Sequence, residues 1–255
     1  MFPILSLRFI PVWRRNVRVW GKLKWPSILG NFGEPLLYLI ALGYGFGRLV
    51  GDIDDMPYMV FLASGIVCSS AMTTASFEAM YSAFTRMTKQ QTWGSMLDAP
   101  MNVDDIVLGE VAWGATKALM SATAILLVSS LLGLVSGPQA ILVLPVVLLL
   151  GFCFASCAMV VTALSPSYDF FLYYFTLVMT PMVLLSGVFF PLDQLPELVA
   201  WGAFMLPLAH GIEIVRPLMT GGTPTLVPLH LAVIAAYAVT GFWLSVMLVR
   251  RRLTA

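Results

Sequence analysis

Six long apolar segments constrain this chain more than any other feature of its sequence. They lie at residues 29–48, 57–78, 110–134, 139–163, 170–190 and 229–249. A helix needs about 20 apolar residues to cross a bilayer, and only helices and closed barrels satisfy their backbone hydrogen bonds there. The chain is 59% hydrophobic and 11% charged, whereas soluble domains have about 45–50% and about 25%. We therefore predict an all-α integral membrane protein, with one membrane domain over residues 1–255 and six transmembrane helices.

The basic residues predict how these helices are oriented. With six spans, both termini lie on one side of the membrane, and Arg48 and Arg216 lie opposite. The side of the termini carries Arg8, Arg14, Arg15, Arg18, Lys22, Lys24, Arg86, Lys89, Arg250, Arg251 and Arg252. Because Lys and Arg are enriched in cytoplasmic loops, both termini are predicted to be cytoplasmic. A net charge of +1 gives no reason to expect nucleic acid as a partner.

Residues 186–222 are too apolar for a solvent loop and too interrupted for a span. Their uninterrupted apolar core, residues 198–206, has about half the length that a span needs. Pro191, Pro196, Pro207 and Pro217 each break or start a helix. Counting this stretch as a seventh span would also place the basic C-terminus outside. We therefore expect re-entrant helices within residues 191–222, on the extracytoplasmic side before the last span.

Residues 11–25 have the pattern of a basic amphipathic helix, with Pro11 in its first turn and Pro26 after its end. One face carries Trp13, Val17, Trp20 and Leu23, and the other carries Arg14, Arg15, Arg18 and Lys22. Such a helix lies in the membrane interface, with its aromatic residues in the acyl boundary and its cations on anionic lipid headgroups. It could equally be a simple positive anchor with no further role.

Residues 81–105 form the main predicted cytoplasmic segment. Residues 85–97 can be helical, Pro100 ends that helix, and Asn102 or Asp104 can cap the third span. We expect an exposed helix whose Met87, Trp93 and Met96 lie beside basic residues, a composition typical of interfaces. The alternative is an amphipathic turn that lies on the bilayer.

No motif in the sequence indicates an enzyme. A phosphate-binding Walker loop needs Gly-Lys followed by Ser or Thr, and no lysine here is followed by either. Two histidines and three cysteines without CxxC spacing argue against a metal site or a disulfide framework. Ser64 with His210 has no supporting residue for a protease. We expect no catalytic residue, no metal and no cofactor on this chain.

Ionisable groups near the spans are candidates for function. Glu110 and Lys117 share a face of the third span, two turns apart and too distant for direct contact, so Lys117 is expected to reach the interface. Glu34 and Glu78 lie near span ends, where a carboxylate needs no special explanation.

The extracytoplasmic segment carries a second set of candidates. His210, Glu213 and Arg216 follow at i,i+3 spacing; a locally paired set that holds short helices in register is favoured over a cargo contact. Phe189, Phe190 and Trp201 suit an interfacial aromatic belt, although sugar rings also stack on such faces.

Several runs together resemble the permease subunit of ABC-2 type exporters. They are GEPLLYLIALGYGFG at 33–47, QQTWGSMLDAP at 90–100, YDFFLYYFTLVMTP at 168–181, SGVFFPLDQLP at 186–196 and PLAHGIEIVRPL at 207–218. The likeness extends over residues 1–252 and is greatest to the nodulation-type exporters of lipo-chitooligosaccharides.

The resemblance implies the ABC-2 (type V exporter) fold in a bacterial inner membrane. It implies a permease homodimer with a nodulation protein I-like ATPase, which would bind ATP and Mg²⁺. Coupling would involve Arg86, Lys89, Gln91, Trp93, Met96 and Leu97. The substrate path or gate would involve Glu34, Phe189, Phe190, Trp201, His210, Glu213 and Arg216. An ion-driven secondary transporter and an enzyme acting on lipid-linked sugars are the alternatives.

Overall fold

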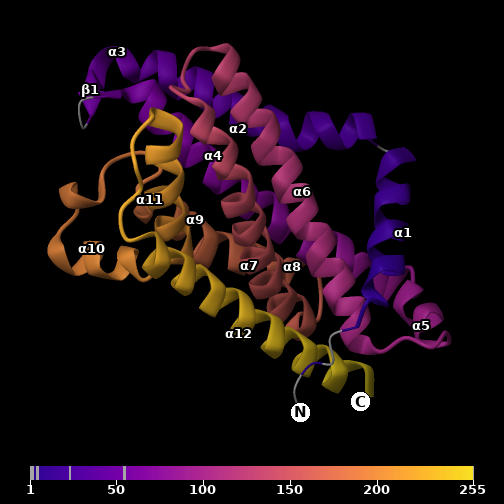
Figure 1. Ribbon diagram of the computed structural model, residues 1–255. Helices are drawn as coiled ribbons and strands as arrows, with labels where there is room; N and C mark the ends of the chain where they lie inside the picture. Colours follow the sequence, from indigo (N-terminus) through magenta and orange to yellow (C-terminus); the bar gives the residue numbers. More distant parts are fainter. Residues whose placement is uncertain (1–2, 4–5, 23, 54–55, 255) are drawn as a thin grey trace.

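The structure is a computed structural model that describes residues 3, 6–22, 24–53 and 56–254, without the side chains of 24–32, 34 and 254. Its helices are α1 (Phe9–Lys22), α2 (Lys24–Gly45), α3 (Gly47–Val50), α4 (Tyr58–Phe77), α5 (Thr92–Leu97), α6 (Val103–Leu131), α7 (Val143–Leu164), α8 (Asp169–Tyr174), α9 (Thr180–Leu185), α10 (Glu197–Phe204), α11 (Pro207–Thr220) and α12 (Val227–Thr254) (Figure 1). Three π-helical segments are η1 (Glu78–Ser82), η2 (Thr85–Lys89) and η4 (Phe175–Met179). Two 3-10 segments are η3 (Pro138–Leu142) and η5 (Leu192–Gln194). A short antiparallel hairpin joins β1 (Asp52–Ile53) to β2 (Met56–Pro57).

The core of the fold is the packing of α4, α6 and α7. Small residues set how closely these helices approach. A Cβ added to Gly151 of α7 would lie 3.1 Å from Ala115 Cα of α6, and one added to Gly114 would lie 2.9 Å from Ala155 Cβ. Close backbone approach through small residues is the usual way in which helices associate in lipid. The remaining helices pack around this group, with α12 lying along α7.

In the described part of the chain, four helical segments are long and apolar enough to cross a membrane. They cover Tyr58–Lys89, Val103–Leu131, Pro138–Leu164 and Val227–Leu253. The predicted first and fifth spans contain shorter apolar helices, Pro35–Val50 and Asp169–Leu185. The helical membrane architecture is therefore confirmed, and the count of six spans stays a prediction.

Two predicted helix ends are wrong for identifiable reasons. The third span begins at Val103 rather than at residue 110, because Asn102 and Asp105 form a capping box before the apolar run. The N-terminal helix ends at Lys22, and Pro26 lies in the first turn of α2 instead of closing α1. A proline is tolerated there because the first backbone N–H groups of a helix have no helical partner.

The segment before the last span folds into two short helices, α10 and α11, which meet at an angle of 85°. Pro196 precedes α10 and Pro207 begins α11, as the proline pattern predicted. Pro217 lies inside α11 and does not end it, so that part of the prediction is wrong. The bend suits either a broken span or a re-entrant pair.

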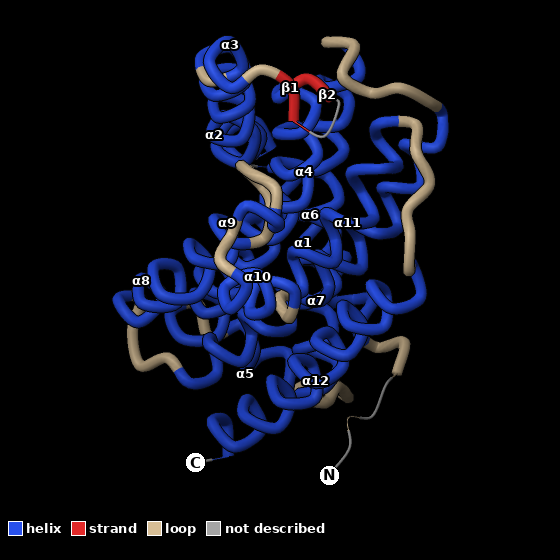
Figure 2. The backbone as a smooth tube through the Cα atoms, turned by 90° about the vertical axis from the view of Figure 1, so that its left-hand side faces the viewer, coloured by secondary structure: helices blue, strands red, loops and turns tan. Residues whose placement is uncertain are grey.

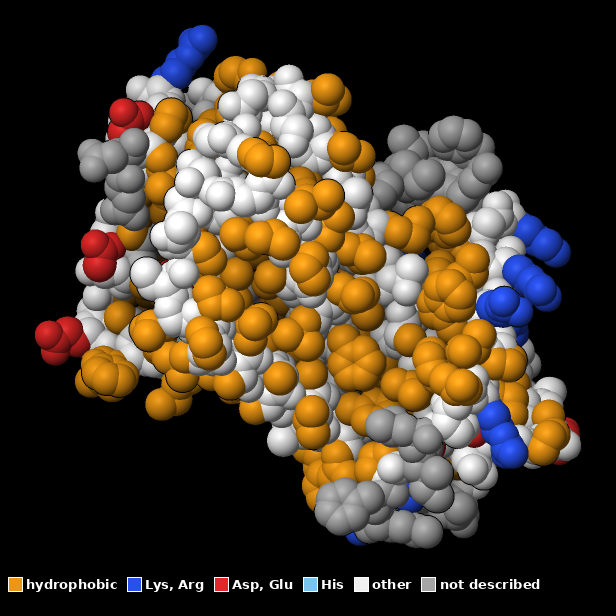
Figure 3. All heavy atoms as spheres, viewed as in Figure 1, with side chains coloured by type: hydrophobic (Ala, Val, Ile, Leu, Met, Phe, Trp, Pro, Cys, Tyr) orange, Lys and Arg blue, Asp and Glu red, His pale blue; other side chains and the backbone are white. Residues whose placement is uncertain are grey.

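Basic and acidic side chains separate along the molecule. On the face in Figure 3, nearly all visible Lys and Arg gather at the end with α1 and α5, and Asp and Glu at the end with α3, β1 and α10. Mostly hydrophobic side chains lie between them. Figure 2 shows α5 and the C-terminal end of α12 opposite the hairpin. We call these the basic end and the acidic end.

Candidate functional site

A buried network of four charged side chains lies near the basic end, where η1 and η2 pass α6. The Arg86 guanidinium donates to Glu78 Oε1 at 2.9 Å and to Glu110 Oε2 at 2.5 Å, and its Nε donates to Glu110 Oε1 at 3.0 Å. Lys117 Nζ lies 3.0 Å from Glu78 Oε2. The two carboxylates are at most 5% exposed and the two cations at most 14%. Two negative charges thus meet two positive charges in a largely buried place.

Uncharged donors complete this network from other elements. Trp93 Nε1 of α5 donates to Glu110 at 3.2 Å, and Trp113 Nε1 of α6 donates to Glu78 at 3.0 Å. Asn16 of α1 donates to Glu110 at 3.0 Å. The network therefore ties α1, η1, η2, α5 and α6 together at one place.

Most of this arrangement was missed by reasoning from the sequence. Lys117 does not reach out to the interface but pairs inward with Glu78, a residue that the sequence presents as an ordinary span-end carboxylate. Glu110 and Lys117 are joined indirectly, through Arg86 and Glu78. The sequence did contain a signal for this pairing. Each of two helices carries a negative and a positive residue about two turns apart, Glu78 with Arg86 and Glu110 with Lys117. Such residues can pair across the contact between the two helices.

The predicted cytoplasmic segment is divided between buried and exposed residues. Trp93 is 0% exposed, Met87 is also buried and Arg86 lies in the network, so the prediction that they stand out on an exposed helix is wrong. Lys89 and Gln91 are exposed, and Met96 and Leu97 are half-buried. The exposed surface is thus the turn between η2 and α5 with the outer side of α5. At this turn Gln91 has φ of +50°, an unusual backbone conformation for a residue other than glycine.

Helix α1 uses its aromatic face to pack on α6 rather than standing alone. Trp13 Nε1 donates to Thr116 Oγ1 at 3.0 Å, and the Trp20 and Trp113 rings meet edge to face. Arg14, Arg18 and Lys22 are exposed, and Arg15 is half-buried. The basic face therefore stays open to lipid headgroups or solvent, and Leu23 lies outside the described residues.

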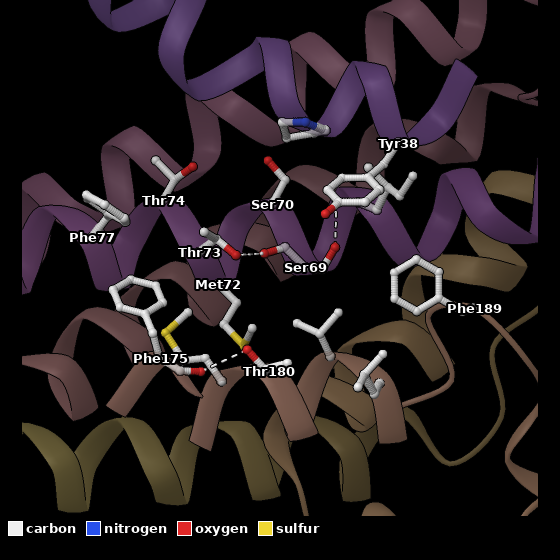
Figure 4. Close-up of a pocket in the computed structure, with 15 residues that line it drawn as sticks. Tyr38, Ser69, Ser70, Met72, Thr73, Thr74, Phe77, Phe175, Thr180 and Phe189 are labelled. Carbon is white, nitrogen blue, oxygen red and sulfur yellow. Dashed lines mark hydrogen bonds between the residues drawn. The ribbon is translucent and has the colours of Figure 1, made fainter. Parts of the chain in front are cut away.

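A pocket of about 670 Å³ opens between α2, α4 and the η4–α9 helix. Its polar wall is a row of α4 hydroxyls together with Thr180, and its other walls are apolar and aromatic. The lining residues are Pro35, Tyr38, Ile66, Ser69, Ser70, Met72, Thr73, Thr74, Phe77, Phe175, Met179, Thr180, Val183, Leu184 and Phe189. In Figure 4 the Phe77 and Phe175 rings lie at one end of the pocket and Phe189 at the other. The cavity thus offers hydroxyls to one part of a ligand and apolar surface to another.

Among the predicted path residues whose side chains the structure describes, only Phe189 lines this pocket. Phe190 is half-buried, and Trp201 on α10 is 72% exposed. The side chain of Glu34 lies outside the described residues.

Two of the three predicted residues of α11, His210 and Arg216, contact different elements. His210 Nδ1 lies 2.7 Å from His230 Nδ1 of α12, with both rings buried. Arg216 lies over the Phe61 ring at 3.6 Å and donates to the Gly187 carbonyl. Its Nε also donates to Ser64 Oγ at 3.1 Å. Glu213 is half-buried.

Comparison with known proteins identifies the family. The model of the ABC-2 type transporter family matches residues 9–220. Nodulation protein J of Sinorhizobium fredii is 47% identical over 253 residues, 99% of this chain and 97% of that protein. Nodulation protein J of Rhizobium leguminosarum bv. viciae is 48% identical over 251 residues, 98% and 97% of the two chains. The inner membrane transport permease YadH of Escherichia coli is 24% identical over 199 residues, 78% and 76% of the two chains. The chain belongs to the ABC-2 type transporter family, as a permease subunit.

Proposed function

We propose that this permease moves a lipo-oligosaccharide of the nodulation-factor type, or a related glycolipid, outward across the bacterial inner membrane. The observation that supports this cargo most is the lining of the pocket. Ser69 and Thr73 present hydroxyls from α4, whereas Phe175, Val183 and Leu184 present aromatic and apolar surface. A ligand with a sugar part and an acyl chain can satisfy both kinds of wall.

The energy for transport comes, in this proposal, from ATP hydrolysis on a separate subunit. An ion-driven transporter needs ionisable groups that can take up and release the coupling ion near the bilayer midplane. The charged groups of the network instead neutralise one another, with two carboxylates against one guanidinium and one ammonium. This arrangement favours the ATP-driven mechanism over the ion-driven one.

The ATPase would dock on the exposed surface at the basic end. That surface consists of the turn at Lys89 and Gln91 and the outer side of α5, with Met96 and Leu97 at its edge. Both termini would then be cytoplasmic, and two permeases would pair with two ATPases. Arg86 and Trp93 would not contact the ATPase; they lie beneath the docking surface and would hold it to the spans.

Reversing the charge at the docking turn should weaken ATPase binding without loss of the permease. For Lys89→Glu we expect the amount of ATPase recovered with the tagged permease to fall by about 3- to 10-fold, because a rim charge at an interface contributes about 1 kcal/mol. Arg14→Glu, an equally exposed cation on α1, is the matched control. Equal recovery with both variants would place the docking surface elsewhere.

Removing one pocket hydroxyl should raise the cargo concentration that transport requires. Thr73→Val keeps the shape of the side chain, and we expect the concentration for half-maximal export into inverted vesicles to rise about 3- to 10-fold, the effect of one lost hydrogen bond. The control is Thr123→Val on α6, since Thr73 and Thr123 are both half-buried and both donate to a carbonyl four residues earlier. Equal effects of the two variants would exclude the pocket as the cargo site.

A further inference from the structure

We infer that a cluster of six contacting aromatic rings at the inner end of the pocket forms the gate through which cargo is admitted from the basic, cytoplasmic end. We call this set the aromatic stack; it consists of Phe77, Tyr81 and Phe84 on one side and Tyr168, Phe171 and Phe175 on the other. The inference rests on the proposed function, since it takes the pocket as the cargo site.

The rings of the aromatic stack interlock across two segments that lie far apart in the sequence. The Phe77 ring centroid lies 4.6 Å from Tyr81 and 5.1 Å from Phe175. Tyr81 lies 5.1 Å from Phe171, and Phe84 lies 5.3 Å from the same ring. These separations are within the range of favourable aromatic pairs. The contacts close the seam between η1 and α8.

A hydrogen bond also joins the two segments where the Phe84 and Tyr168 rings meet. Phe84 lies 5.0 Å from Tyr168, and the Tyr168 hydroxyl lies 2.8 Å from Thr85 Oγ1. Phe84 and Phe171 are 3% and 0% exposed. Phe77, at the pocket end of the stack, is 48% exposed. An aromatic belt that faces lipid would leave Phe84 and Phe171 exposed as well, so the part of the stack away from the pocket is an internal contact.

The stack lies between the pocket and the surface proposed for ATPase docking. Phe77 and Phe175 line the pocket and bound one end of it, as Figure 4 shows. From Phe77 the chain continues through η1 and η2 to α5 at the basic end, while Phe189 bounds the opposite end of the pocket. Cargo that enters from the basic end along this seam must separate these rings first.

All three π-helical segments of the described chain adjoin the aromatic stack. Tyr81 lies in η1, Phe84 directly precedes η2, and Phe175 begins η4. π-helical turns are rare, and those inside α-helices are frequently found at functional sites. A π turn carries one residue more than an α turn, so its conversion to α geometry rotates the downstream part of the helix by about 100°. The rings can therefore change partners while the helices around them stay intact.

The charge network connects this seam to the docking surface. Glu78 follows Phe77 directly and is held by Arg86 of η2, which also binds Glu110. Trp93 of α5 donates to the same Glu110. A displacement of α5 is thus transmitted through paired charges to the residues next to the stack. This is a physical route by which ATPase movement would open the gate.

The gate is tested by the rate at which a pocket cysteine becomes accessible. Ser69→Cys provides the reporter, in permease with its native cysteines replaced by alanine and its ATPase bound. Labelling by a membrane-impermeant maleimide is measured in inverted vesicles, where the basic end faces the reagent. Phe77→Ala with Tyr81→Ala should accelerate labelling about 10-fold or more, the effect of removing about 1.4 kcal/mol of ring contacts. Phe152→Ala, which removes a ring 6.1 Å from Phe242 away from the pocket, should leave the rate unchanged.

A second arm holds the gate shut. In this arm position 69 carries an azide-bearing residue that is labelled by a membrane-impermeant cyclooctyne, so that the thiol reagent reacts only with the gate cysteines. Phe77→Cys with Phe175→Cys, bridged by a short bis-methanethiosulfonate reagent before labelling, should reduce reporter labelling to background. Cleavage of the bridge before labelling should restore it. Labelling of the alanine variant at the parental rate, or of the bridged protein at the unbridged rate, would overturn the inference. If the alanine variant fails to accumulate, the bridged pair alone decides. The labelling assay contains no cargo. If the cargo were assigned wrongly, the export assays would fail but these labelling rates would stay the same.

Discussion

Arg86→Met should sharply reduce the accumulation of folded permease. The substitution leaves Glu110, 1% exposed, without its cationic partner, while Glu78 keeps Lys117. Removing one partner of a buried ion pair costs about 3–5 kcal/mol, and the entire stability of a typical protein is about 5–15 kcal/mol. We expect the yield of monodisperse protein in detergent to fall at least about 10-fold, and the apparent melting temperature of the remainder to fall clearly.

Two further variants separate the lost charge from the lost side-chain volume. Arg86→Met combined with Glu110→Gln removes both charges of the pair, so it should recover most of the yield. Arg14→Met removes an exposed arginine of α1 and should behave as the parent. An Arg86→Met protein as abundant and heat-stable as the parent would refute the role of the network in folding.

The network also needs an explanation beyond stability. Buried ion pairs seldom stabilise a protein more than apolar side chains of the same volume would, because desolvation opposes their attraction. Here the charges join five elements, among them the α5 surface proposed to meet the ATPase. Directional contacts hold these elements in register, whereas apolar contacts would let them slide. A role in transmitting movement to the spans accounts for such an arrangement.

The sequence predicted the helices well where length and apolar character decide them. The spans that begin near residues 57, 139 and 229 correspond to α4, η3–α7 and α12 within a few residues. Of the two residues predicted as possible caps of the third span, Asn102 and Asp104, Asn102 is the cap. The 85° bend before α12 lies where Pro196 and Pro207 predicted that helices begin. These features depend on local chemistry, which one sequence is sufficient to show.

The site could not be predicted in the same way, because it depends on which helix faces meet. The helical wheel of residues 85–97 assumes a uniform period of 3.6, but the chain changes from η2 to α5 through a turn at Gln91 with positive φ. This turn brings Trp93 inward. Likewise Glu78 becomes a network residue only because α6 places Lys117 opposite to it. Neither fact is contained in the pattern of one segment.

Trp93→Glu should therefore destroy the fold rather than uncouple transport in an intact protein. Trp93 is 0% exposed, and its indole N–H donates to Glu110. Truncation of a buried tryptophan costs about 3–5 kcal/mol, and a new carboxylate beside Glu110 adds repulsion between two buried negative charges. We expect no folded Trp93→Glu protein, whereas Trp93→Phe, which keeps most of the packing, should fold with a loss of about 1–3 kcal/mol.

Met96→Glu distinguishes this structural role from docking. Met96 lies on the same short helix but is half-buried at the edge of the proposed docking surface. Its variant should accumulate to a clearly higher level than Trp93→Glu, because Met96 packs only at the edge of the core and is not fully buried, and should recover less ATPase. The contrast assigns the two faces of α5: one holds the helix to the charge network, and the other meets the partner. If Trp93→Glu accumulated normally and lost only the ATPase, α5 would have to turn its tryptophan outward, and the path from the docking surface through Glu110 to the aromatic stack would not exist.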